Sequence, residues 1–146
     1  MAEIFSIVNQ KGGVGKTTTC INLSAALAKA KRRVLLIDLD PQSNATKGCG
    51  TVLREESFTV NDLLLNRCNF EDAVLHLDNF KFDILPSTPQ LTEAEVLLLS
   101  SDDKEFTLKN VMSDVASKYD YLIIDCPPSL NILTVNALTG SSGIII

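Results

Sequence analysis

The fold is decided by a stretch near the N-terminus, Ile4-Phe5-Ser6-Ile7-Val8-Asn9-Gln10-Lys11-Gly12-Gly13-Val14-Gly15-Lys16-Thr17-Thr18. It opens with an apolar, β-rich run at residues 4–8 and leads into residues 17–29, whose apolar positions recur at the spacing of one helix face. A glycine loop between a strand and a helix turns backbone N–H groups and the positive end of the helix dipole toward one anion. The stretch therefore predicts a phosphate-binding loop.

The side chains that follow the glycines fit the same chemistry. Lys16 is placed to reach the β- and γ-phosphates of a nucleotide, and the Thr17 hydroxyl to bind Mg²⁺. Thr18 adds a hydroxyl donor toward the α-phosphate, whereas Gln10 stands where the pattern GxxxxGK[ST] has its first glycine. A glycine-rich turn without a ligand is the alternative, which the lysine and threonine disfavour. The expected nucleotide-binding residues are Lys11, Gly12, Gly13, Val14, Gly15, Lys16, Thr17 and Thr18.

Outward from the loop, apolar β-rich runs alternate with helical patterns, which is typical of a parallel sheet covered by helices. The expected strands after the first are 34–37, 82–85, 121–124 and 143–146. The expected helices after the first are 59–65 with a capping box at Thr59, 92–99, 108–118, and one capped by Ser129. Together with the phosphate-binding loop, this pattern predicts an α/β fold of the parallel-sheet P-loop NTPase type, with helices on both faces and no domain linker.

Three carboxylates follow apolar strands. Asp38 and Asp40 come directly after one strand, and Asp125 ends another. Open α/β sheets bind ligands at the carboxyl ends of their strands, so these groups can hold Mg²⁺, directly or through water, or orient the attacking water. Asp38 and Asp40 can also simply cap the turn before Pro41. An unpaired carboxylate at the end of a buried strand is costly, which favours a metal-site role for Asp125.

Composition excludes several classes of protein. The 146 residues are 45% hydrophobic and 21% charged with a net charge of −5, which suits one globular domain and disfavours binding of nucleic acid by charge alone. The four cysteines show no CxxC spacing, so we expect free thiols in a reducing cytoplasm and no zinc site. His76, the one histidine, is expected to be a bystander.

Two further patterns have a structural and a functional interpretation. Cations at positions 29 and 31–33 are stabilised by the C-terminal end of a helix dipole. We favour this structural interpretation over a contact with DNA. Leucines at 97–99 are expected to be helix core rather than a membrane anchor. The run at 143–146 starts another strand with no cap or turn after it, so we expect the chain to continue in the natural protein.

Three segments together resemble a known family. They are Asn9–Thr18 with the pattern KGGxGK[ST], Leu36-Ile37-Asp38-Leu39-Asp40-Pro41-Gln42, and Tyr119–Ser129. In this combination the chain resembles the ParA/MinD family of deviant Walker A P-loop ATPases, most closely the ParA (Soj-like) partition proteins. The resemblance implies that residues 1–146 are the N-terminal portion of a single ParA-like nucleotide-binding domain, of the AAA-type group that includes CobQ, CobB, MinD and ParA.

The resemblance also implies roles for individual residues. Lys11 would reach the partner's nucleotide across an ATP-bound dimer, and Lys16 and Asp40 would complete the catalytic set, with Asp40 positioning the hydrolytic water. Thr17, Asp38 and Asp125 would surround Mg²⁺. The implied cofactors are ATP and Mg²⁺, and the implied reaction is hydrolysis of ATP to ADP and phosphate, slow alone and stimulated by a partner.

At the level of the cell, the resemblance implies chromosome or plasmid partition. ATP would drive formation of a homodimer that binds nonspecific DNA through a C-terminal part beyond residue 146, and a ParB-like centromere-binding protein would stimulate hydrolysis. The implied location is the cytoplasm, at the bacterial nucleoid, without a membrane partner. A MinD-like ATPase that cycles on a membrane is the alternative, and a P-loop synthetase is a more distant one.

Overall fold

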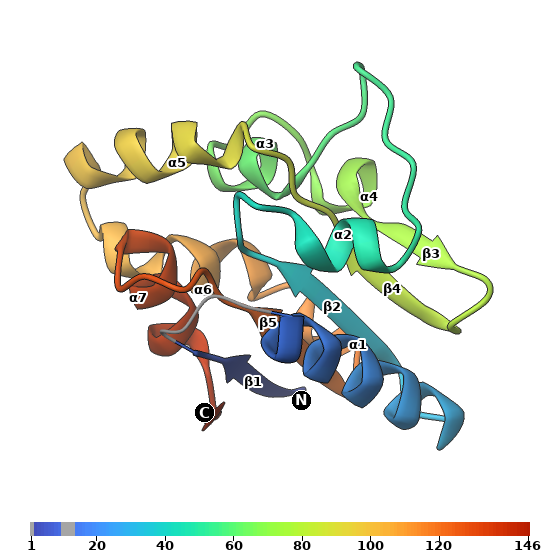
Figure 1. Ribbon diagram of the computed structural model, residues 1–146. Coiled ribbons are helices and arrows are strands. Elements are labelled where there is room, and N and C mark those ends of the chain that lie inside the picture. The colour runs from blue at the N-terminus through green and yellow to red at the C-terminus, as the bar shows by residue number, and fades with distance from the viewer. Residues whose placement is uncertain (1, 10–13) are drawn as a thin grey trace.

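A single sheet organises the chain. The computed structural model describes residues 2–9 and 14–146 (Figure 1), and within them the strand order is β3-β4-β2-β5-β1-β6. Five strands pair in parallel: β1 (Glu3–Ile7), β2 (Val34–Asp38), β4 (Phe82–Leu85), β5 (Tyr121–Asp125) and β6 (Gly143–Ile145). The edge strand β3 (Leu75–Leu77) runs antiparallel to β4. The expected parallel sheet is confirmed, with one antiparallel strand added.

Helices cover both faces of this sheet. The described helices are α1 (Val14–Lys29), α2 (Asn44–Gly48), α3 (Val60–Leu64), α4 (Phe70–Ala73), α5 (Leu91–Leu97), α6 (Thr107–Met112) and α7 (Ile132–Gly140), with 3-10 turns η1 (Leu98–Ser100), η2 (Lys104–Phe106) and η3 (Ala116–Lys118). Alternate residues of β2 enter different cores: Leu35 and Ile37 pack with α3, α5, α6 and α7, whereas Val34 and Leu36 pack with α1 and α2. The two-residue period of a strand therefore builds two hydrophobic layers, and the helices on both faces are confirmed.

The capping prediction at residue 59 is confirmed. Thr59 is the N-cap of α3, and its backbone N–H donates to Asp62 Oδ2 at 2.9 Å to complete a capping box. The prediction that Ser129 caps the last helix is wrong, because Asn131 is the N-cap of α7. The Asn131 Oδ1 atom accepts from the Leu133 backbone N–H at 2.8 Å and so satisfies a donor that lacks an intrahelical partner.

Two other expectations differ from the structure, and α2, for which the sequence analysis gives no helix, follows β2. The expected helix over 108–118 is divided into α6 and η3. Among the leucines expected to be core, only Leu98 is buried (3% exposed), while Leu97 and Leu99 are 44% and 58% exposed. The reason is geometric, since three consecutive residues of a helix cannot all lie on one face.

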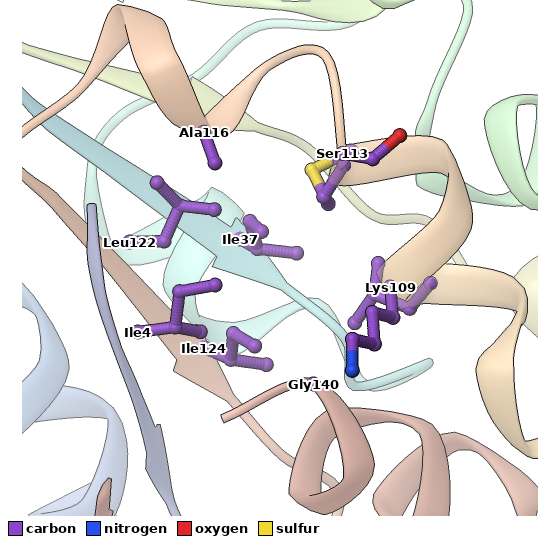
Figure 2. A pocket seen from close by; sticks show the side chains of 10 residues that line it. Ile4, Ile37, Lys109, Ser113, Ala116, Leu122, Ile124 and Gly140 are labelled. Atoms are coloured by element: carbon purple, nitrogen blue, oxygen red, sulfur yellow. The ribbon is translucent and has the colours of Figure 1, made fainter. Parts of the chain in front are cut away.

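A small apolar cavity separates the sheet from α6 and η3. It has a volume of about 200 Å³ and is lined mainly by aliphatic side chains of β1, β2, β5 and α6. Figure 2 shows Ala116 of η3, Leu122 of β5 and Ile37 of β2 among the side chains around this cavity. The packing on this face of the sheet is therefore incomplete.

Candidate phosphate and metal site

The carboxyl ends of the central strands bring the candidate residues together. Asp38 ends β2 and is the register partner of Asp125, which ends β5, while Ile7 of β1 is aligned with Asp125 from the other side. The first turn of α1 lies beside these strand ends, so Lys16 and Thr17 meet Asp125 although more than 100 residues separate them in the chain. The topology therefore builds one site from three segments, at the edge where open α/β sheets bind ligands.

Lys16 lies at the centre of this site. Its ammonium contacts Asp125 Oδ1 directly and lies 3.7 Å from Asp40 Oδ2. The residue is 5% exposed, and burial lowers the pKa of its ammonium, but the two carboxylates outweigh that effect and raise the pKa above its usual value. Lys16 is therefore held as a buried cation at the place where a nucleotide phosphate is expected.

Thr17 and Asp125 offer neighbouring oxygen atoms. The Thr17 hydroxyl donates to Asp125 Oδ2 at 3.1 Å, and Asp125 is fully buried. Burial raises the pKa of the Asp125 carboxyl, and the contacts with Lys16 and Thr17 oppose that rise. In residues 2–9 and 14–146, no three His, Cys, Asp or Glu side chains gather into a protein-only metal cage. A hydroxyl and one carboxylate nevertheless fit Mg²⁺, which commonly takes few protein ligands and completes its shell with phosphate and water oxygens.

Asp38 is engaged elsewhere. Its Oδ2 accepts from the backbone N–H and the hydroxyl of Thr46 at 2.9 and 2.6 Å, and its Oδ1 accepts from the Asp40 N–H at 3.2 Å. Burial raises the pKa of Asp38 to about 7, against the opposing hydrogen bonds from Thr46. The structure thus places Asp38 against α2, while Thr17 and Asp125 contact each other, and the metal role of Asp38 stays a prediction.

Asp40 has one anchored carboxylate oxygen and one directed into the site. Its Oδ1 accepts from the Gln42 N–H at 3.0 Å, and its Oδ2 faces Lys16. The Ser87 hydroxyl donates to the Asp40 carbonyl at 2.8 Å, and the Ser87 N–H donates to the Thr46 hydroxyl at 2.9 Å. Sequence reasoning missed Ser87 and Thr46. Ser87 carried a usable signal, because it is a polar residue just after β4 at the ligand-binding edge.

The phosphate loop itself is described only from residue 14 onward. The predictions for Lys11, Gly12 and Gly13 lie outside the described residues, and Val14 begins α1. Thr18 is exposed, as is Gly15, where an added Cβ would meet no atom within 4 Å. Packing of the described chain therefore does not require a glycine at position 15. A phosphate that approaches the backbone closely would require the absence of a side chain there.

Two cysteines are near the site without joining its chemistry. Cys20 and Cys126 are both fully buried. Burial raises the pKa of the Cys126 thiol to about 12 and that of Cys20 further still. Both remain protonated near neutral pH, so neither serves as a nucleophile.

Comparison with known proteins places this geometry in a family. The family described as an AAA domain matches residues 2–146. A Pseudomonas putida protein of unassigned function is 54% identical, with 100% of this chain and 56% of that protein covered. The chromosome partitioning protein ParA of Myxococcus xanthus is 47% identical, with 100% of this chain and 52% of ParA covered. The sporulation initiation inhibitor protein Soj of Bacillus subtilis is 46% identical, with 100% and 58% covered.

Solved structures agree with the sequence relatives. A cobyrinic acid a,c-diamide synthase of Mycobacterium smegmatis with bound ADP and magnesium has a TM-score of 0.94 at 38% identity, covering 99% of this chain and 58% of the synthase. The ATP complex of Cyanothece McdA has a TM-score of 0.90 at 29% identity, covering 98% and 55%. The chain spans little more than half the length of these relatives. From the family match, the ParA and Soj relatives and the shared fold, the chain belongs to the AAA domain family and, within it, to the ParA/MinD group of P-loop ATPases.

Proposed function

We propose that this chain carries the phosphate- and magnesium-binding half of an ATPase that partitions chromosomes or plasmids. One observation carries the proposal: Lys16, Thr17, Asp40 and Asp125 converge beside the start of α1, at the carboxyl edge of β2 and β5. The name of the M. xanthus relative supports the partition role, and the ADP, ATP and magnesium in the related structures support the ligands.

In the proposed reaction, Lys16 is the positioned cation. Its buried ammonium is held by Asp125 and Asp40, so it is ordered before phosphate arrives and loses little freedom on binding. Thr17 Oγ1 and Asp125 Oδ2 are the residues that would hold Mg²⁺. The bound ion would neutralise charge on the β- and γ-phosphates.

Asp40 is the proposed water-positioning residue. The Gln42 N–H fixes one carboxylate oxygen and the Ser87 hydroxyl fixes the carbonyl of the same residue, so the backbone and side chain are both held. The other carboxylate oxygen remains available to accept a hydrogen bond from a water beside the γ-phosphate. Thr46 supports this arrangement from α2, since its hydroxyl binds both Asp38 and Ser87.

ATP-dependent dimerisation is part of the proposal, with Lys11 acting across the interface. The surface of α5 and η1 supports it, because Val96, Leu97 and Leu99 are large apolar side chains exposed at 67%, 44% and 58%. Glu95, in the same segment, is close enough to Asp40 that this carboxylate adds to the effect of burial in raising the Glu95 pKa. An apolar surface this close to the nucleotide site is suited to a partner subunit.

The remaining parts of the proposal concern partners. The dimer would bind nonspecific DNA through a region outside this chain, and a ParB-like protein would stimulate hydrolysis, in the cytoplasm at the nucleoid. Within residues 2–9 and 14–146, none of the helices has the length and apolarity needed to span a membrane.

The deciding experiment measures ATP turnover of the intact protein with duplex DNA, with anionic lipid vesicles, and with neither. Stimulation by DNA supports partition. Stimulation by vesicles alone would replace it with a MinD-like membrane cycle. Absence of any ATP binding would overturn the nucleotide-binding proposal itself.

A synthase is the second candidate, because the M. smegmatis cobyrinic acid a,c-diamide synthase shares 38% identity and a TM-score of 0.94. Such an enzyme needs a carboxylic acid substrate to consume ATP productively. Turnover that depends on added cobyrinic acid and an amide-nitrogen donor, and is indifferent to DNA, would favour the synthase.

A further inference from the structure

A basic hollow lies at the amino ends of the strands, opposite the phosphate loop. It has a volume of about 460 Å³, and its charged or titratable lining side chains are Arg32, Arg33, His76, Lys81, Asp83, Lys118 and Tyr119. The cations come from three separate connections, those that precede β2, β4 and β5. Figure 1 shows the end of α1 and the β3–β4 turn on the same side of the molecule. Four cations thus converge from three loops, in a chain with a net charge of −5.

Two of these cations form no close ion pair in the described part of the chain, although Arg32 acts on Asp120 at longer range. Arg33 pairs with Asp120 at 3.2 Å, and Lys118 pairs with Glu71 at 2.9 Å. Arg32 and Lys81 have no carboxylate within 4.0 Å among the residues that the structure describes. Their charges are therefore available to an anion that enters the hollow.

The one carboxylate in the hollow is already engaged. The Tyr119 hydroxyl donates to Asp83 Oδ2 at 2.6 Å, and His76 Nδ1 lies 2.6 Å from Asp83 Oδ1. These contacts draw Asp83 toward Tyr119 and His76. The lining therefore holds four cations, Arg32, Arg33, Lys81 and Lys118, against this one carboxylate.

Helix electrostatics explains only part of this cluster. Arg32 follows the C-terminal end of α1, where cations are favoured by the helix dipole alone. Lys81 instead lies on the β3–β4 turn with φ 64°, a left-handed conformation that glycine or asparagine adopts at lower cost. A helix dipole therefore does not account for the cation that position 81 contributes to the hollow.

We propose that this hollow is a second phosphate-binding site, which takes a polyphosphate anion through Arg32, Lys81, Arg33 and Lys118. A guanidinium grips phosphate oxygens in pairs, and the ammonium groups add point charges. Several cations spread over one hollow favour an extended polyanion over a single phosphate. Free polyphosphate and the backbone of a nucleic acid share this chemistry. The inference rests on the geometry of the hollow and is independent of the proposed ATPase activity.

His76 makes the proposal directly testable, because it is the only histidine of the chain and its ring lines the hollow. The experiment titrates inorganic tripolyphosphate into the intact protein, with saturating ADP and Mg²⁺ to fill the phosphate loop, and follows the His76 ring signals by NMR. We expect a saturable shift, and a loss of affinity of about tenfold or more in Arg32→Gln/Lys81→Gln. The matched control, Arg54→Gln/Lys109→Gln, removes two exposed cations elsewhere and should bind as the natural protein does.

A second arm replaces tripolyphosphate with a short DNA duplex. The two ligands are compared at equal concentrations of phosphate groups. If the duplex shifts the His76 signals at the lower concentration, the ligand is a nucleic-acid backbone, and if tripolyphosphate does so, the ligand is free polyphosphate. Either result supports the site. An unmoved His76 signal, equal affinity in the Arg32→Gln/Lys81→Gln variant, or the same shift from sodium chloride at matched ionic strength would overturn it. A thermal melt of each variant verifies that the fold is retained.

Discussion

Lys16 and Asp125 are in direct contact, although Lys16 lies in the first turn of α1 and Asp125 ends β5. Both side chains are at most 3% exposed, so each is the main compensation for the buried charge of the other. The contact also leaves Asp125 Oδ2 facing the Thr17 hydroxyl. The same carboxylate thus orients the phosphate-binding lysine and presents an oxygen for a metal ion.

The first prediction concerns Asp125→Asn. Loss of the carboxylate leaves Lys16 without its nearest counter-ion, so the free energy of unfolding should fall by roughly 3 kcal/mol in urea titrations. The Mg²⁺-dependent gain in ATP affinity should also fall, by on the order of tenfold. Asp114→Asn, which alters an exposed carboxylate, is the control. An undiminished Mg²⁺ dependence would remove Asp125 from the metal site.

The second prediction concerns Asp40→Ala. Asp40 faces Lys16 at 3.7 Å but is not its closest partner, so ATP binding should survive while turnover falls on the order of a hundredfold or more. The blocked enzyme should accumulate as an ATP-bound dimer, detected by light scattering after size exclusion. A variant that binds ATP and remains monomeric would contradict the ATP-driven dimer.

The third prediction uses the pH dependence of stability. Burial raises the pKa of Asp38 from an ordinary value near 4 to about 7 in the folded protein. The folded state then binds more protons than the unfolded state between these values, so this group lowers stability as pH rises from about 4 through 7. Asp38→Asn removes the ionisation. The free energy of unfolding of this variant, relative to that of the natural protein, should therefore increase as the pH is raised from 5 to 8. Urea unfolding of both proteins across that range measures the difference, and a flat difference would refute the buried ionisation.

How far the sequence predicts this site depends on the range of the interaction. The strand ends Asp38 and Asp125 are predictable because a continuous apolar run, typical of a strand covered on both faces, stops at each of them. The contact of Asp38 with Thr46 is not, since it depends on α2, a five-residue helix too short to show an apolar period. The edge strand β3 was missed for a similar reason, because its three residues gain their conformation from pairing with β4.

The fourth prediction tests the apolar cavity. Ala116→Leu should fill part of the space of about 200 Å³ and raise the free energy of unfolding by about 1 kcal/mol. Leu122→Ala should enlarge the cavity and lower stability by about 3 kcal/mol. Because both side chains line the same cavity (Figure 2), the double variant should be more stable than the sum of the two single stability changes predicts. Ser117→Leu, at the exposed neighbouring position, is the control, and an equal gain there would show that the cavity is not the cause.

The fifth prediction concerns Lys11, which lies outside the described residues and is proposed to act on the nucleotide of the partner subunit. Lys11→Ala should abolish most turnover and leave ATP binding by the monomer intact. Mixing inactive Lys11→Ala with inactive Asp40→Ala separates the two possible geometries. If Lys11 acts across the dimer, each mixed dimer has one complete site, made of Asp40 from one subunit and Lys11 from the other. Random pairing in a two-fold dimer then restores about a quarter of the natural turnover. If Lys11 acts within its own subunit, every site in every dimer lacks one of the two residues, and the mixture stays inactive.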